Sequence, residues 1–181
     1  MTFQISKFAG ALKKGGARPT LFKVDLSTPF DRDLNSISSF LIQASSLPSS
    51  SIGPIEVPYM GRKMRVAGDR SFETWSVTVI NDEDFKIRHA MEKWHNQINS
   101  LRGNLNQTGG SEPANYKFQA KVMQYGKSDE NNPIREYEFY GLFPIEISSI
   151  DLDWNSTDDI ERFNVQFSFD WYESVGKNPL A

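Results

Sequence analysis

Apolar and polar residues alternate along much of this chain, and this two-residue period predicts β-strands. The clearest case is the stretch 72–80, where Trp75, Val77 and Val79 alternate with polar neighbours. Other strands are expected at 20–26, 37–44, 56–66, 116–125, 134–149 and 160–172. In the last of these, one face is apolar and consists of Phe163, Val165, Phe167, Phe169 and Trp171.

One segment follows a helical period instead. Apolar side chains spaced three or four residues apart predict an amphipathic α-helix over 83–101, built around Ile87, Met91, Trp94 and Ile98. Asn81 or Asp82 is expected to cap its N-terminus, and Gly103 is expected to end it. Together these patterns predict a mainly β fold, a β-sandwich or barrel-like pair of packed antiparallel sheets with one flanking α-helix.

The connections are indicated by clusters of proline, glycine and polar residues. These clusters predict loops at 27–36, 48–56 and 102–115, and a turn at 67–71 around Gly68-Asp69-Arg70. The stretch 56–66 is expected to be one strand or a strand pair bent at Met60-Gly61. We expect three regions: a flexible segment at 1–16, a single domain at 17–173 and a flexible tail at 174–181.

Composition narrows the class of protein. With 20 basic and 23 acidic residues the formal charge is −3, whereas a nucleic-acid binder would be expected to have a basic balance. The absence of cysteine excludes disulfides, thiolate nucleophiles and Cys-ligated zinc. No signal peptide and no membrane anchor are expected, because no apolar run is long enough. The 13 Phe, 6 Tyr and 4 Trp fit a β-sheet core and, for some of them, subunit interfaces.

Candidate catalytic or metal-binding chemistry is sparse. The only two histidines, His89 and His95, lie on the predicted helix. Glu92 precedes His95 by three residues, a spacing that di-metal sites use when several helices supply ligands, and only one helix is expected here. Gly126-Lys127-Ser128 resembles the end of a phosphate-binding loop, but the position that requires the earlier glycine is Lys121.

An acidic stretch contains Asp151, Asp153, Asp158 and Asp159. It lacks the central glycine and terminal glutamate of a calcium-binding loop, so a solvated loop is the preferred interpretation. We therefore expect no catalytic residues, no metal site, no cofactor and no enzymatic activity.

Four stretches of the chain resemble, in this order, the tail tube protein family of contractile-tailed bacteriophages. They are ARPTLFKVDL, IGPIEVPYMGRKMRVAGDRSFETWSVTVINDEDF, ANYKFQAKVMQYGK and YEFYGLFPIEISSIDLDWNSTDDIERFNVQFSFDWYE. The resemblance covers residues 17–173, and the loop at 99–115 and the segment 174–181 depart from the family pattern. It implies a structural subunit that forms hexameric rings, which stack into a tube inside a contractile sheath and enclose a channel for DNA ejection.

The resemblance also implies partners and a place of action. The expected partners are further copies of the chain, the tail sheath protein, baseplate and tube-terminator proteins, the tape-measure protein and double-stranded genomic DNA. The protein is expected in the virion tail, after assembly in the host cytoplasm. Alternatives are an inner-tube subunit of a non-viral contractile injection system, related to type VI secretion tubes, and a baseplate tube initiator. A small-ligand-binding β-barrel is a more distant alternative.

Candidate interface residues surround the basic cluster Arg62, Lys63 and Arg65. The nearby Gly68-Asp69-Arg70 lacks the helix start and glycine spacing of a phosphate site, which favours a surface fitted to another subunit. We expect 72–82 to anchor the chain to the core and 48–66 to reach a neighbouring subunit through Ile52, Pro54, Val57, Tyr59, Met60, Arg62, Lys63 and Arg65. The candidate acidic residues of the channel lining, where negative charge would repel DNA phosphates, are Glu136 and Glu138.

Overall fold

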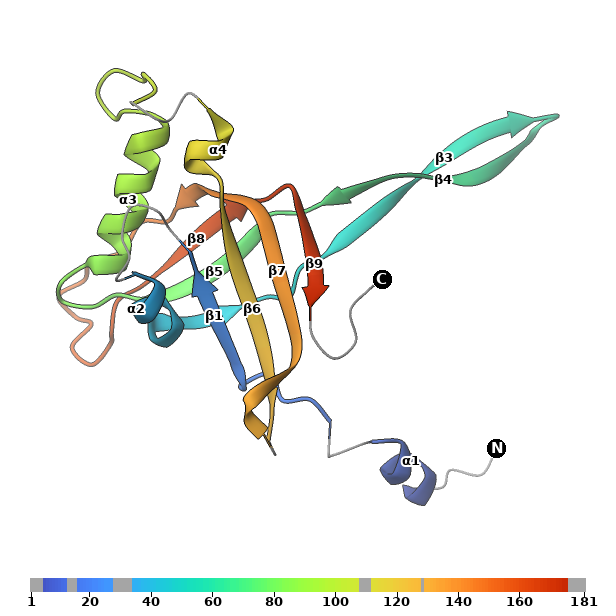
Figure 1. Cartoon of the computed structure of the whole chain (residues 1–181), viewed down its shortest axis with the longest axis horizontal. Helices are drawn as coiled ribbons and strands as arrows, with labels where there is room; N and C mark the ends of the chain where they lie inside the picture. Colours follow the sequence, from blue (N-terminus) through green and yellow to red (C-terminus); the bar gives the residue numbers. More distant parts are fainter. Residues whose placement is uncertain (1–4, 13–15, 28–33, 108–111, 128, 176–181) are drawn as a thin grey trace.

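The computed structural model describes residues 5–12, 16–27, 34–107, 112–127 and 129–175. The strands in these residues are β1 (Phe22–Leu26), β2 (Ile42–Ser45), β3 (Ser50–Tyr59), β4 (Arg62–Phe72), β5 (Trp75–Ile80), β6 (Phe118–Gly126), β7 (Asp129–Ile147), β8 (Arg162–Ser168) and β9 (Trp171–Val175). The helices are α1 (Ile5–Ala11), α2 (Leu34–Leu41), α3 (Lys86–Ile98) and α4 (Pro113–Tyr116). Figure 1 shows two layers of strands, with α3 on one side and a long hairpin projecting from the opposite side.

Seven strands form one antiparallel sheet that bends along β7 into two facing layers. The first layer has the order β1–β6–β7–β9, and the second has the order β2–β5–β8–β7. β7 belongs to both layers, because residues 136–140 pair with β9 and residues 143–147 pair with β8. Gly141 lies between these parts with φ +68, a conformation that glycine adopts without a Cβ penalty. The predicted mainly β fold with packed antiparallel sheets is confirmed, and the described strands form no closed barrel.

Aromatic side chains fill the space between the two layers. Trp75 from β5 stacks on Phe139 from β7 with ring centroids 4.5 Å apart, and Phe167 from β8 lies 5.5 Å from Trp75. The buried Trp75 indole N–H donates a hydrogen bond to the Ser46 carbonyl at 2.9 Å, so its polar atom is satisfied. The interior formed by the described strands is therefore a packed aromatic core, and not the ligand cavity that the distant barrel alternative requires.

α3 packs against β7 and α2 through one face, which consists of Ile87, Ala90, Met91 and Trp94. The helical period of the sequence predicted this face correctly. The helix is three residues shorter at each end than the expected 83–101, and its N-cap is Phe85 rather than Asn81 or Asp82. The Asp82 carboxylate nevertheless accepts the backbone N–H of the first helical residue at 3.1 Å. Among the helices that the structure describes, none is long and apolar enough to cross a membrane.

The strand expected at 37–44 is wrong over most of its length, because α2 occupies its first half and β2 begins only at Ile42. Ile37 and Leu41, four residues apart, pack against the core. Ser38 between them is fully buried, and its hydroxyl accepts the Leu26 backbone N–H at 3.4 Å. A short segment of this composition fits both a helical and a strand period, and contact with the core decides between them.

β3 and β4 pair with each other and form the projecting hairpin, named here the arm (residues 50–72) (Figure 1). Met60 and Gly61 connect the two strands with φ angles of 43 and 78, the two-residue turn with positive φ that suits a hairpin. The strand pair bent at Met60-Gly61 is therefore confirmed. The loop expected at 48–56 is wrong, because β3 covers most of it.

The turn expected at 67–71 is also wrong, because β4 continues through Gly68 without a break. A Cβ added to Gly68 would lie 2.6 Å from the Gly53 carbonyl oxygen on the opposite strand. The pairing register of the arm shifts at this place, between Ile52 and Pro54. Gly68 thus allows a close approach of two backbones and does not reverse the chain.

The single strand expected at 160–172 consists of two strands, since the chain leaves β8 and crosses to the first layer at Phe169 and Asp170. The Asp170 backbone N–H donates to the Tyr140 carbonyl at 2.9 Å in this crossing. The crossing interrupts the alternation of buried and exposed side chains along the chain. Trp171 is therefore 48% exposed and does not continue the buried apolar face of β8. β9 extends to Val175, two residues beyond the boundary expected for the domain.

Candidate assembly surfaces

The arm has two different faces, because directly paired residues of a β-ribbon place their side chains on the same side. The pairs on the first side, named the apolar face, are Ile55 with Val66, Val57 with Met64, and Tyr59 with Arg62. The pairs on the second side, named the charged face, are Pro54 with Ala67, Glu56 with Arg65, and Pro58 with Lys63. The arm is therefore an amphipathic ribbon.

The apolar face is open to solvent. Every residue of β3 is exposed, and Met60 at the tip is 88% exposed. Large apolar side chains stabilise a protein by about 25 cal/mol per Å² when they are removed from water, and monomers rarely expose many of them together. The apolar face consequently has the character of an interface that lacks its partner.

The basic cluster is divided between the two faces. On the charged face, Lys63 Nζ lies 2.6 Å from Glu56 Oε2, and Arg65 Nε lies 3.4 Å from Glu56 Oε1. Arg62 lies on the apolar face and has no ion pair within the described part of the chain. Ion pairs with Glu56 therefore satisfy Lys63 and Arg65, whereas the charge of Arg62 on the apolar face has no such role in the described part of the subunit.

The structure brings all eight predicted interface residues together on the arm, but not on one surface. Val57, Tyr59 and Arg62 are on the apolar face, Pro54, Lys63 and Arg65 are on the charged face, Met60 is at the tip, and Ile52 is near the base. Their role in subunit contacts stays a prediction.

The first layer has an outer face, opposite the core, that includes Glu136 and Glu138. Lys121 Nζ lies 3.5 Å from a Glu136 carboxylate oxygen and 3.4 Å from a Glu138 carboxylate oxygen. These two side chains are only 19% and 14% exposed. Burial alone lowers the pKa of Lys121, but the two carboxylates outweigh burial and raise it, so Lys121 stays charged. The predicted lining residues are thus partly neutralised within the subunit.

Further charges continue along this outer face. Asp25, Lys121, Glu138 and Glu173 lie side by side in register across the four strands of the layer. The next row holds Tyr140 and Trp171, whose rings stack at 5.3 Å. Burial first, and then the neighbouring Glu138 and Glu173, raise the pKa of Tyr140, which keeps its hydroxyl neutral. Lys23 also lies on this face, with its Nζ 3.3 Å from Asp25 Oδ1, and the described carboxylates still outnumber the two ammonium groups of Lys23 and Lys121.

The first layer also has two free edges. Among the described strands, β1 pairs only with β6 and β9 pairs only with β7, so each has a row of unpaired backbone groups. All three pairings within the layer are antiparallel, and β1 and β9 therefore run in opposite directions. Sequence reasoning did not identify these edges, because it treated β9 as the end of another strand.

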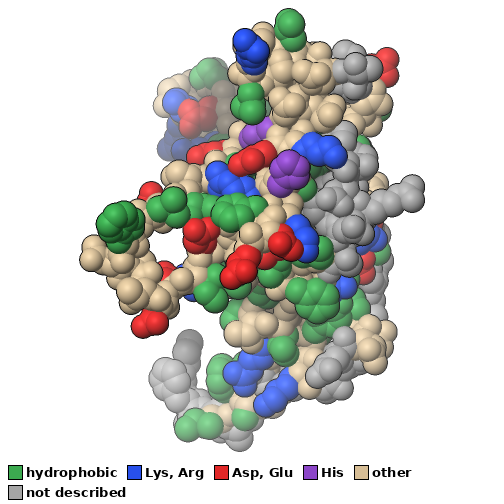
Figure 2. All heavy atoms as spheres, turned by 90° about the vertical axis from the view of Figure 1, so that its left-hand side faces the viewer, with side chains coloured by type: hydrophobic (Ala, Val, Ile, Leu, Met, Phe, Trp, Pro, Cys, Tyr) green, Lys and Arg blue, Asp and Glu red, His purple; other side chains and the backbone are tan. Residues whose placement is uncertain are grey.

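Glu92 and His95 do not converge on a common site. Glu92 Oε1 accepts a hydrogen bond from Arg88 Nε at 3.0 Å, and His95 Nε2 lies 3.1 Å from the Pro144 carbonyl oxygen. No group of three potential metal-binding side chains occurs in the residues that the structure describes. Figure 2 shows both histidines on the α3 side of the molecule, among acidic and basic side chains.

We expect acidification to destabilise the subunit through His95. Burial lowers the pKa of His95, and its hydrogen bond with Pro144 opposes this only in part. The folded state then binds a proton less readily than the unfolded chain, whose histidine pKa is about 6.5, so stability is lost as the pH falls through this value toward the lower folded pKa. Thermal unfolding between about pH 8 and 5 should show a flatter pH dependence for His95→Gln than for the wild type. The exposed His89→Gln variant serves as the control and should retain the wild-type dependence; equal profiles for His95→Gln and the wild type would contradict the prediction.

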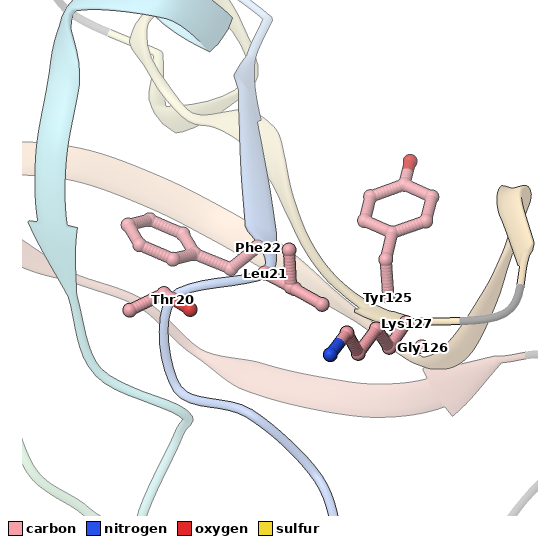
Figure 3. Close-up of a pocket in the computed structure, with 6 residues that line it drawn as sticks. All are labelled: Thr20, Leu21, Phe22, Tyr125, Gly126 and Lys127. Carbon is pink, nitrogen blue, oxygen red and sulfur yellow. The ribbon is translucent and has the colours of Figure 1, made fainter.

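Gly126-Lys127 lies at the end of β6, beside the beginning of β1. A surface pocket there is lined by Thr20, Leu21, Phe22, Tyr125, Gly126 and Lys127 (Figure 3). The figure shows the side chains of Phe22 and Tyr125 diverging, so they do not converge on a shared ligand position. Lys127 follows the strand in a turn, as predicted, and the next described element is the strand β7 from Asp129 rather than a helix that could cradle a phosphate.

The acidic stretch lies in the loop between β7 and β8, and its residues 151–160 are exposed, as expected for a solvated loop. Asp159 pairs with Arg162 at 2.9 Å, and Asp153 accepts the Asn155 backbone N–H at 3.0 Å. The composition did not indicate that Trp154 would be fully exposed, at 100%. Trp154 lies between Asp153 and Asn155 and belongs to no helical or strand pattern of apolar residues. This position in the sequence could have indicated that its side chain is exposed.

Solved structures share this fold and define its class. The tube-terminating cap of the anti-feeding prophage superposes with a TM-score of 0.64 at 14% identity, covering 89% of this chain and 91% of that chain. A chain of the extended sheath–tube complex of an extracellular contractile injection system gives a TM-score of 0.59 at 13% identity, covering 97% and 99%. The fold is therefore one that occurs in contractile injection systems.

Sequence similarity identifies the family within this class. The family model described as phage tail tube protein matches residues 6–175. Tail tube protein gp19 of Enterobacteria phage T4 is 37% identical over 157 residues, which cover 87% of this chain and 91% of that protein. The chain belongs to the phage tail tube protein family and is a homologue of the T4 protein.

Proposed function

We propose that the chain is the repeating subunit of a phage tail tube. Its copies form hexameric rings, the rings stack inside a contractile sheath, and the stack encloses a channel for DNA ejection. The observation that carries this proposal is the uncovered apolar face of the arm, because such a surface needs a second molecule. Relatives more than 30% identical are tail tube proteins of phages T4 and T6, which favours a phage tail over a non-viral injection particle or a baseplate initiator.

The free edges of the first layer support ring formation. β1 and β9 run in opposite directions, so β9 of one copy and β1 of the next can pair as antiparallel neighbours. Because each copy contributes an even number of strands, four, neighbouring strands remain antiparallel at every junction around a closed ring. Closure also removes the exposed edges, which would otherwise promote uncontrolled association. The number of six copies comes from the family resemblance.

In such a ring the outer face of the first layer lines the channel. Glu136 and Glu138 then face the channel beside Lys121, together with Asp25 and Glu173. The excess of carboxylates weakens binding of DNA phosphates, which lets the DNA slide. The excess over the whole face matters more than either predicted residue, since Lys121 pairs with both.

The proposal includes the remaining partners and the place of action. The sheath surrounds the tube, the baseplate and the terminator lie at its ends, and the tape-measure protein and genomic DNA occupy the channel. The protein is a component of the virion tail that is assembled in the host cytoplasm. Support for the terminator and the sheath comes from the shared fold with a tube cap and with a chain of a sheath–tube complex.

Negative-stain microscopy and sedimentation of the purified protein test this function. Rings or hollow tubes are expected at high protein concentration, or after addition of baseplates that nucleate them. A protein that stays monomeric at every concentration, and forms no tubes on baseplates, would contradict the proposal.

Charge reversal in the basic cluster tests the role of the arm. We expect the double variant Arg62→Glu/Lys63→Glu to remain folded and to fail in assembly, because a carboxylate buried without a partner costs several kcal/mol. A loss of this size corresponds to at least a 100-fold increase in the concentration needed for assembly, at about 1.4 kcal/mol for each factor of ten. Tubes of normal length from the double variant would contradict the prediction.

A further inference from the structure

The loop 149–161 between β7 and β8, named here the Trp154 loop, forms a surface pocket with an unusual lining. Its apolar lining residues are Ile150, Leu152, Trp154 and Ile160, and its acidic lining includes Asp151 and Asp159. Trp154 is 100% exposed, although its ring is the largest apolar surface of the loop. Folding of the subunit does not require this exposure, so the pocket resembles half of an interface.

The charges of the Trp154 loop are complementary to those of the arm. The loop carries five carboxylates, on Asp151, Asp153, Asp158, Asp159 and Glu161, and no basic residue. The pocket lining also includes Arg162 at the start of β8, which pairs with Asp159 at 2.9 Å, so the pocket as a whole remains acidic. Of these, Asp151 and Asp158 have no hydrogen-bond or ion-pair partner among the described residues. The tip of the arm presents the opposite combination, with Tyr59 and Met60 beside the unpaired Arg62.

The two surfaces lie on opposite sides of the subunit, so they cannot meet within one copy. The arm projects from one side of the layers, and the connection from β7 to β8 lies on the α3 side (Figure 1). Figure 2 shows exposed hydrophobic and acidic side chains close together on the α3 side. Two complementary surfaces on opposite sides form a head-to-tail contact, which closes into a ring or grows as an open stack according to the rotation between neighbouring copies.

We propose that the tip of the arm of one copy docks into the Trp154 loop of a second copy. Met60 and Tyr59 cover the apolar lining of the pocket, and the Arg62 guanidinium reaches the Trp154 ring and the carboxylate of Asp151, both of which line the pocket. A guanidinium over an indole ring and next to carboxylates combines a cation–π contact with charge-assisted hydrogen bonds. The inference rests on the proposed function, and it adds the surface that receives the arm.

Cross-linking between copies tests this contact directly, since the chain contains no cysteine and each variant has a single thiol. Met60→Cys protein and Ser156→Cys protein are mixed in equal amounts, assembled and oxidised. We expect disulfide-linked dimers in the assembled fraction of this mixture. The control mixture of Met60→Cys with His89→Cys, an exposed position of α3, should give at least tenfold fewer dimers.

An exchange of charges provides the second measurement. Arg62→Asp alone and Asp151→Arg alone should each prevent assembly. In a mixture in which these two proteins alternate, every interface carries an Arg–Asp contact, so assembly should recover in part. Tubes that form without the Met60–Ser156 cross-link, and with normal yield from Asp151→Arg, would overturn the inference and leave the tube function intact. Failure of the wild type to assemble at all would instead overturn the proposed function, and this inference with it.

Discussion

Replacement of Val57 and Met64 by serine is expected to weaken tube assembly strongly while the subunit stays folded. These two residues are directly paired on the apolar face of the arm and are exposed in the single subunit. Folding of the subunit therefore loses little from the change, whereas assembly loses the burial of two apolar side chains. At about 1.5–3 kcal/mol for a fully buried side chain, and less for these partly shielded ones, the loss is roughly 2–3 kcal/mol for each contact.

A loss of this size raises the concentration required for assembly by about 30- to 150-fold, which sedimentation and microscopy can measure. The matched control replaces Pro58 and Lys63, the directly paired residues of the charged face, by serine. The control should assemble close to the wild-type concentration, because Lys63 makes an exposed ion pair with Glu56 and such pairs contribute little. Equal assembly by both variants would show that the apolar face is not the interface.

Trp75→Ala is expected to have the largest effect on the stability of the subunit. Trp75 is 1% exposed, stacks on Phe139 and donates a hydrogen bond to Ser46. Its removal leaves a cavity between the two layers, which costs about 3–5 kcal/mol in the free energy of unfolding. Urea unfolding of the unassembled subunit should show this decrease, together with a fall in Tm of roughly 6–20 °C for a chain of this size.

Trp171→Ala is the control for this experiment. Its ring stacks on Tyr140 at the surface of the first layer and is about half exposed. We expect it to cost about 1 kcal/mol, in line with an exposed aromatic pair. If Trp171→Ala destabilised the subunit as much as Trp75→Ala, the assignment of the core would be wrong.

The residues that the sequence placed correctly are those whose environment depends on their immediate neighbours. The alternation at Trp75, Val77 and Val79 sets one side of a strand against the core, and the spacing of Ile87, Met91 and Trp94 does the same for α3. The helical identity of α2 was missed because contact with β1 and the core decides it. The break between β8 and β9 depends on the passage from one layer to the other, which no local pattern records.

The candidate interface was predicted in part for the same reason. Proline, exposed apolar residues and basic residues set residues 48–66 apart from the core strands, but the arm continues through the expected turn at 67–71 to Phe72. Its two faces depend on the pairing register, and a shift of one residue would exchange them, so Arg62 and Lys63 have opposite surroundings despite being adjacent. The proximity of Lys121 to Glu136 and Glu138 likewise depends on the pairing of β6 with β7.

The continuity of β7 has a mechanical consequence. One backbone runs through both layers, from residues paired with β6 and β9 to residues paired with β8. A shear force on the first layer is therefore transmitted to the second layer through covalent bonds as well as through side-chain packing. In a tube driven forward by a contracting sheath, the two layers of each subunit would move as one rigid unit, and the load would fall on the contacts between subunits.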